Sequence, residues 1–150
     1  MPDSKKIAIS ADHAGFQLKV QVAEYLKKQG YDVLDLGTMS EERVDYPDYG
    51  YVLAEAIRDA KAPRGISICG SGIGISIALN RFKDVRCALA HDVTTARLSR
   101  SHNDANVLAL GARLIGPDLA IECVNAFLNT PFEGGRHAGR VDKLGKCGTK

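Results

Sequence analysis

A cysteine followed by alternating glycines is the most distinctive chemical feature of this sequence. Residues 69–74 read Cys-Gly-Ser-Gly-Ile-Gly and follow an apolar, strand-like run. Alternating glycines between a strand and a helix let the backbone turn tightly and direct several N–H groups at an anion. Cys69 stands at the mouth of this loop, where the amides and the helix N-terminus favour the thiolate over the thiol. The segment therefore predicts an anion hole beside a thiolate that acts as a base.

The glycine loop also admits two other interpretations. Similar turns bind dinucleotides, and Asp92 lies about 20 residues further on, where such sites place a ribose-binding acid. The spacing is GxGxG rather than GxGxxG, however, and the loop follows the third strand-like run rather than the first. As a peroxide or disulfide sensor, Cys69 lacks a resolving cysteine nearby in the sequence. A nucleotide-binding module and a redox sensor remain the alternatives to an enzyme.

Acidic and imidazole side chains follow two other strand-like runs. Asp12 and His13 come directly after the first run, and His91 and Asp92 come after the fourth. Ligands of parallel α/β sheets bind beyond the carboxyl ends of the strands, so these residues are candidates for the same site. A capping aspartate beside a structural histidine would give the same pattern.

Polar and basic residues recur nearer the C-terminus. His102 and Asn103 stand at the predicted end of a helix, where a histidine can simply be a favourable partner of the helix dipole. Arg136 and Arg140 flank His137 and are four residues apart. On a helix both guanidinium groups would share one face and could clamp a phosphate, although a basic tail is more often only solvated.

The elements that position these residues alternate along the chain. Strands are predicted at 5–10, 31–37, 64–70, 85–90 and 106–111. Helices are predicted between Gly15 and Gly30, around 52–57 with Val52, Leu53, Ala56 and Ile57 facing inward, after the glycine loop, over 93–102, and from Pro117 to Phe127. Strands joined through helices run parallel, and helices then cover both faces of the sheet. The sequence therefore predicts an α/β fold, a three-layer α/β/α sandwich with a five-stranded parallel sheet.

Length and composition fit one domain over residues 1–150. The chain is 45% hydrophobic and 25% charged, as in an average globular protein. Its 20 basic and 18 acidic side chains give a formal charge of +2, so no general electrostatic argument supports nucleic acid or a membrane surface as a partner. Any anion must be bound locally.

Several signals are missing from the sequence. No apolar run reaches the roughly 18 residues that a membrane span needs, and no signal-peptide core follows Met1, so we expect a cytoplasmic protein. The four cysteines form no CxxC pair, which indicates reduced thiols; Cys87 and Cys123 are predicted to be inert core residues. Without HExxH, paired CxxC or clustered carboxylates, we expect no metal site and no cofactor.

Five segments in order resemble the ribose-5-phosphate isomerase B family, which includes the galactose-6-phosphate isomerase subunits. They are ADHAGF with Asp12 and His13, DYPDY around Tyr46, CGSGIGISIALN from Cys69, SRSHNDANVLALGAR from Ser99, and EGGRHAGRV from Glu133. The resemblance covers about Lys5 to Val141. It implies a Rossmann-like sheet with strand order 2-1-3-5-4 and a metal-independent aldose–ketose isomerase of the pentose phosphate pathway, working through an enediol intermediate.

The resemblance also implies a role for each matching residue. Cys69 would move a proton between C1 and C2, Ser71 would shuttle a hydroxyl proton, and His102, assisted by Asp12, would open the furanose ring. The other substrate-binding residues would be His13, Arg136 and Arg140 at the phosphate with His137 nearby, the loop Gly70, Ser71, Gly72, Ile73 and Gly74 at the enediolate oxygen, and Asn103, Arg113 and Tyr46 elsewhere in the pocket. One branch of the family carries a glutamate base where this chain has Ile75, so Cys69 is expected to be indispensable.

Family resemblance further implies a homodimer with composite sites, in which His102 and its neighbours come from the second subunit, and which can pair into a tetramer. The expected substrate is ribose 5-phosphate and ribulose 5-phosphate. A hexose-6-phosphate isomerase acting on allose or galactose 6-phosphate is the alternative, because one extra carbon changes only the length of the pocket.

Overall fold

The structure is a computed structural model and describes residues 4–148. The strands are β1 (Lys6–Ala11), β2 (Asp32–Asp35), β3 (Arg64–Cys69), β4 (Cys87–Leu89) and β5 (Val107–Gly111). The helices are α1 (Phe16–Lys28), α2 (Tyr46–Arg58), α3 (Ile73–Leu79), α4 (Val93–Ser101), α5 (Pro117–Asn129) and α6 (Arg136–Leu144). Strand and helix alternate from β1 to α5, as the sequence predicts.

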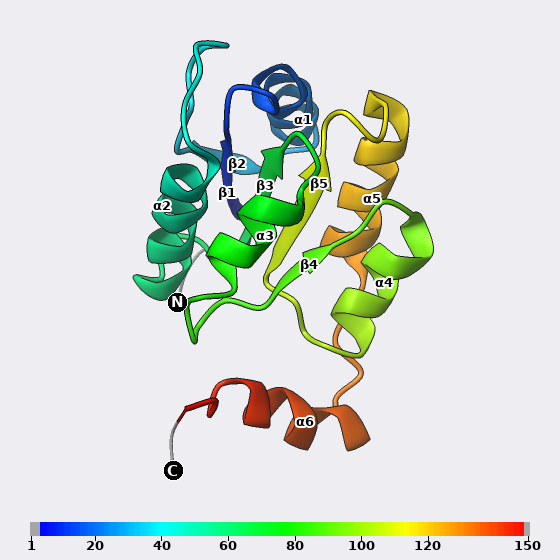
Figure 1. The fold of residues 1–150 in the computed structure, drawn as a ribbon. Coiled ribbons are helices and arrows are strands. Elements are labelled where there is room, and N and C mark those ends of the chain that lie inside the picture. The colour runs from blue at the N-terminus through cyan, green and yellow to red at the C-terminus, as the bar shows by residue number, and fades with distance from the viewer. Residues whose placement is uncertain (1–3, 149–150) are drawn as a thin grey trace.

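The five strands form one parallel sheet in the order β2-β1-β3-β5-β4, which confirms the predicted fold. Side chains alternate between the two faces of each strand: Ile7 and Ile9 of β1 face one core and Ala8 faces the other. The first core packs against α1, α4 and α5, and the second packs against α2 and α3. Figure 1 shows the resulting three layers.

The edge strands and one helix differ from the sequence prediction. The predicted strands at 31–37 and 85–90 shorten to β2 and β4, which pair on one side only and so lose support near their ends. On α2, Leu53 and Ala56 are buried as predicted, but Val52 is exposed and Ala54 takes an inward position. The prediction for Val52 was wrong because the buried face of α2 runs through Gly50, Leu53 and Ala54, which leaves Val52 toward solvent.

An ion pair fixes the connection between α1 and β2. Lys19 is fully buried, and its Nζ donates to both carboxylate oxygens of Asp35 at 2.6 and 2.8 Å. Asp35 also accepts the backbone N–H of Gly37 at 3.0 Å. These bonds satisfy the buried charge and hold the chain that leads toward the site.

Helix α6 stands apart from the sandwich. It lies beyond the amino ends of the strands, at the foot of the molecule in Figure 1, and His137 is its only buried residue. No helix was predicted at this position, but α6 carries Arg136 and Arg140 four residues apart, the spacing that a shared helical face needs. No helix within residues 4–148 combines the length and apolar character needed to cross a membrane.

Candidate active site

The glycine loop folds its backbone around the sulfur of Cys69. β3 ends at this cysteine and α3 begins at Ile73, and in the turn between them Gly72 adopts a φ of 76°. The N–H of Gly72 donates to Sγ of Cys69 at 3.1 Å, and the cysteine is only 4% exposed. The turn thus directs a backbone N–H donor at the sulfur.

Gly72 is required here for two reasons. Its positive φ is costly for any residue with a Cβ. A Cβ would also lie 2.9 Å from the carbonyl carbon of Leu110 and 2.5 Å from a side-chain methyl of Leu89. The loop can therefore close on Cys69 only with glycine at this position.

A cavity of about 410 Å³ opens at the carboxyl end of the sheet beside Cys69. Eight of the predicted site residues line it: Asp12, His13, Tyr46, Cys69, Gly70, Ser71, Gly74 and Arg113. The cavity is also lined by Ala14, Arg43 and Leu114. Arg43 was missed by the sequence analysis; its place just before the DYPDY segment is the only signal that pointed to it.

Backbone contacts hold the acidic and imidazole groups of this cavity. Asp12 is buried, and its Oδ1 accepts the N–H of Gly15 at 3.1 Å. Nδ1 of His13 lies 3.1 Å from the carbonyl oxygen of Val44 and 3.2 Å from its amide nitrogen. These contacts orient His13 through one ring nitrogen and leave the other for a ligand.

Hydroxyl, aromatic and guanidinium groups complete the wall. Oγ of Ser71 accepts the N–H of Ile73 at 3.1 Å, while the side chain of Ile73 is half exposed. The ring of Tyr46 covers Gly74 so closely that a Cβ there would lie 2.6 Å from it. The side chain of Arg113 lies over Gly70 in the same manner, at 3.3 Å.

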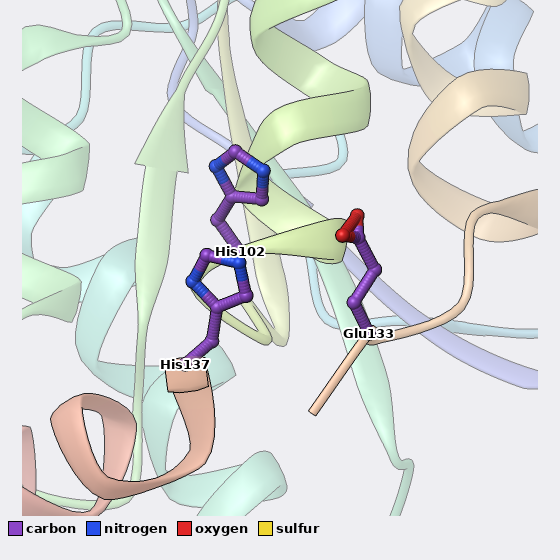
Figure 2. Close-up of side chains that lie close together, drawn as sticks. All are labelled: His102, Glu133 and His137. Carbon is purple, nitrogen blue, oxygen red and sulfur yellow. The ribbon is translucent and has the colours of Figure 1, made fainter. Parts of the chain in front are cut away.

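The remaining predicted residues gather elsewhere in the chain. His102, Asn103, His137 and Arg140 line a separate cavity of about 260 Å³, and Arg136 is exposed nearby on α6. The imidazoles of His102 and His137 stack with their centroids 4.4 Å apart and their planes at 15° (Figure 2). Desolvation of the imidazole and the positive charge of Arg136 lower the pKa of His137, which favours the neutral ring.

The two groups of residues lie at opposite ends of the parallel strands. Helix α4 begins after β4, at the carboxyl ends of the strands, where Cys69 lies. Its C-cap, His102, lies beside α6 at the amino ends of the strands (Figure 1). One chain therefore does not bring His102 to Cys69.

Two of the candidate polar residues have structural partners. Asp92 caps α4: its carboxylate accepts the N–H and the hydroxyl of Thr95 at 2.7 and 2.8 Å, and these bonds lower its pKa. Nε2 of His91 accepts the N–H of Gly111 at 3.1 Å. Asp92 is thus engaged as an N-cap, which removes the main support for a ribose-binding acid.

The other cysteines are free and differ in their environments. Cys87 lies on the partly exposed edge strand, yet desolvation raises the pKa of its thiol well above the usual value. Burial likewise raises the pKa of Cys123, and Cys147 is exposed. A larger cavity, of about 610 Å³, lies between the end of α3, β4 and α6, but Asn103 is the only predicted site residue in it. The smaller cavity is the candidate active site, because the Cys69 thiol meets the amide loop there.

The model of a protein family described as Ribose/Galactose Isomerase matches residues 7–144. The chain belongs to this family. Ribose-5-phosphate isomerase B of Escherichia coli is 46% identical over 140 residues, which cover 93% of this chain and 94% of that protein. D-erythrulose-4-phosphate isomerase of Pectobacterium atrosepticum is also 46% identical over 140 residues, covering 93% and 92%.

A solved member of the Ribose/Galactose Isomerase family has the same fold. Ribose-5-phosphate isomerase B of Clostridium thermocellum superposes with a TM-score of 0.93 at 52% identity, covering 94% of this chain and 95% of that one. The family and the sheet order that the motifs predicted are therefore confirmed.

Proposed function

We propose that this chain interconverts ribose 5-phosphate and ribulose 5-phosphate, a step of the pentose phosphate pathway, through an enediolate. The observation that carries the proposal is the contact of the Cys69 sulfur with the Gly72 amide, at the edge of a cavity that also holds Asp12, His13 and Ser71. Family membership supports the same reaction. A nucleotide-binding module would need an acid other than Asp92, which caps α4.

In this mechanism the thiolate of Cys69 removes the proton from C2 of the open-chain aldose and returns it to C1. The electron pair released from C2 moves onto the carbonyl oxygen, and the loop amides from Gly70 to Gly74 stabilise the negative charge there. The Ser71 hydroxyl transfers a proton between O1 and O2. The step needs no redox cofactor, because one carbon is oxidised while its neighbour is reduced.

His102, assisted by Asp12, is proposed to open the furanose ring, and His13, His137 and the two arginines of α6 to hold the phosphate. Within one chain, His102 and α6 lie at the amino ends of the strands, whereas Cys69 lies at the carboxyl end of β3. We therefore propose that a second copy of the chain supplies His102 and α6. Exposed Ile73 and Ile77 lie one turn apart on α3, and Leu114 is exposed beside the cavity; such apolar side chains suit an interface between copies. The basic C-terminal segment thereby completes the site of the partner, and pairing of two dimers would give a tetramer.

The reaction is tested by following ribose 5-phosphate by NMR in deuterated buffer containing a chelator. Conversion with deuterium at C1 of ribulose 5-phosphate, and at C2 of the ribose 5-phosphate re-formed by the reverse reaction, would support a metal-independent enediolate mechanism. Loss of both signals in Cys69→Ala would support Cys69 as the base. Absence of conversion in the unaltered chain would reject the proposal.

The composite site is tested by mixing two inactive variants. In a mixed dimer of Cys69→Ala and His102→Ala chains, one of the two sites combines an intact Cys69 with an intact His102. Co-expression in equal amounts should restore about a quarter of the unaltered activity, because half of the dimers are mixed and each has one intact site. No restoration would place Cys69 and His102 in one chain's site.

A second candidate function differs only in the sugar. The family description includes galactose, and two relatives of equal identity carry the names of a pentose- and a tetrose-phosphate isomerase. We therefore compare kcat/KM for erythrose 4-phosphate, ribose 5-phosphate, and allose and galactose 6-phosphate. Preference for ribose 5-phosphate supports the first proposal, and preference for a tetrose or hexose replaces it. Free cysteines and a phosphorylated substrate agree with the proposed cytoplasmic location.

A further inference from the structure

Three side chains that can ligate a metal ion converge where α4, α6 and the segment between α5 and α6 meet. His102, Glu133 and His137 each offer one donor atom, and these atoms lie within 4.8 Å of one another. Figure 2 shows the two imidazoles one above the other with the carboxylate of Glu133 beside them. The backbone fixes this arrangement, because the N–H of Glu133 donates to the carbonyl oxygen of Ser101 at 3.1 Å.

The cluster contains a buried nitrogen without a partner. Within residues 4–148, only Oγ of Ser101 and Nε2 of His137 are buried side-chain polar atoms that lack a hydrogen bond. His137 is 6% exposed, so solvent does little to satisfy this nitrogen. Leaving a buried polar atom unpaired is destabilising, and a ligand that bonds to this nitrogen would remove that cost.

We propose that His102, Glu133 and His137 form a binding site for a divalent transition-metal ion of the zinc class. Two imidazoles and one carboxylate suit Zn²⁺ and its neighbours rather than Mg²⁺ or Ca²⁺, which prefer oxygen ligands alone. Three protein ligands leave a fourth position of a tetrahedral ion to water or another small ligand. All three come from one chain, so no residue of a second copy is needed as a ligand.

The geometry requires only a small closure. Ligands at about 2.0–2.1 Å around a tetrahedral ion lie roughly 3.4 Å apart, and the three donor atoms here already lie within 4.8 Å of one another. Glu133 is exposed and His102 half-buried, so rotation of these two side chains can close the gap around the more firmly held His137. Arg136 and Arg140 oppose a cation, but both side chains are exposed and solvent screens them.

Metal binding has a consequence that rests on the proposed function. A metal-bound nitrogen of His102 can no longer accept or donate the proton that ring opening requires. The ion would also hold His137 away from the phosphate of the substrate. We therefore expect zinc to act as a reversible inhibitor of the isomerase.

The site is tested first by calorimetry with Zn²⁺ alone, using the metal-free full chain carrying Cys147→Ser to remove the exposed thiol. We expect one zinc per chain and at least tenfold weaker binding in His102→Ala, Glu133→Gln and His137→Ala. His91→Ala and Glu122→Gln, which change the same residue types elsewhere, should bind as before. Unchanged affinity in the three site variants, or weakening in Cys69→Ser instead, would overturn the proposal.

Imidazole NMR of the unsubstituted histidines provides a second readout in case a variant does not fold. Zinc should shift the ring resonances of His102 and His137 and leave those of His13 and His91 in place; the reverse pattern would contradict the site. In the activity arm, zinc should inhibit ribose 5-phosphate isomerisation and a chelator should restore it. Binding without inhibition would retain the metal site and overturn its proposed link to His102. Because calorimetry needs no turnover, an inactive chain would not affect the test of the site.

Discussion

The amide of Gly72 and the sulfur of Cys69 lie 3.1 Å apart and form a hydrogen bond within the turn that joins β3 to α3. One backbone turn thus positions the proposed base and supplies amides for the oxyanion. Since both groups belong to the same four-residue turn, a change in the loop affects them together.

Replacing Cys69 by alanine should lower kcat for ribose 5-phosphate by about 10³-fold, within the usual range for loss of a general base. KM should change little, because the loop amides that contact the sugar remain. Initial-rate assays measure the decrease in kcat, and thermal unfolding shows whether the variant is folded. A folded variant with full activity would reject Cys69 as the base.

Gly72→Ala should both destabilise the protein and abolish activity, because its Cβ would collide with the backbone of β5 in a turn that needs a positive φ. Urea unfolding and isomerase assays measure the two effects. Gly116→Ala is the matched control: Gly116 has a φ of −83° and no atom within 4 Å of an added Cβ, so only a small change is expected. Equal stability of the two variants would contradict the assigned role of Gly72.

Asp35→Ala should lower the free energy of unfolding by about 3 kcal/mol, because it leaves the buried ammonium of Lys19 without its carboxylate. Lys19→Met should cost less, since it removes the buried charge and leaves a carboxylate with access to solvent. Denaturant unfolding of both variants tests the order. A larger loss in Lys19→Met would show that packing of the lysine stem matters more than its charge.

His102→Ala should impair ribose 5-phosphate much more than erythrose 4-phosphate. The tetrose phosphate carries its phosphate on O4 and cannot form a furanose ring, so it bypasses the proposed ring-opening step. The measurement is the ratio of kcat/KM values for the two sugars in the variant and in the unaltered chain. An unchanged ratio would assign His102 a role other than ring opening.

Stability should fall in alkaline solution partly through Cys87. Desolvation raises the pKa of its thiol in the folded chain above the ordinary value of 9.0, so the unfolded chain loses its proton first. The stabilisation is complete below about pH 9 and decreases as pH rises above it, because ionisation then favours unfolding. Thermal unfolding between pH 8 and 10 should therefore show a smaller decrease in Tm for Cys87→Ala than for the unaltered chain. Parallel decreases would show that the Cys87 thiol is not protected from ionisation.

Local sequence determined most of the fold and the first half of the site. Apolar periodicity predicted the alternation of strands and helices. Parallel connections then placed Asp12, Cys69 and Ser71 together, because each stands at or just beyond the carboxyl end of a strand. The sequence-based prediction was less accurate for the lengths of the edge strands β2 and β4 and for α2. Val52 of α2 is exposed because burial there depends on how the helix packs on the sheet.

Which distant polar residues meet depends on how the helices and strands pack. Asp92 and His91 look like site residues in the sequence, but one caps α4 and the other accepts a backbone N–H of β5. His102 precedes β5 and therefore lies at the amino ends of the strands, away from Cys69, where it meets Glu133 and His137. No single motif encodes that cluster: Glu133 and His137 lie four residues apart in one segment, but His102 joins them only because the end of α4 packs beside the start of α6.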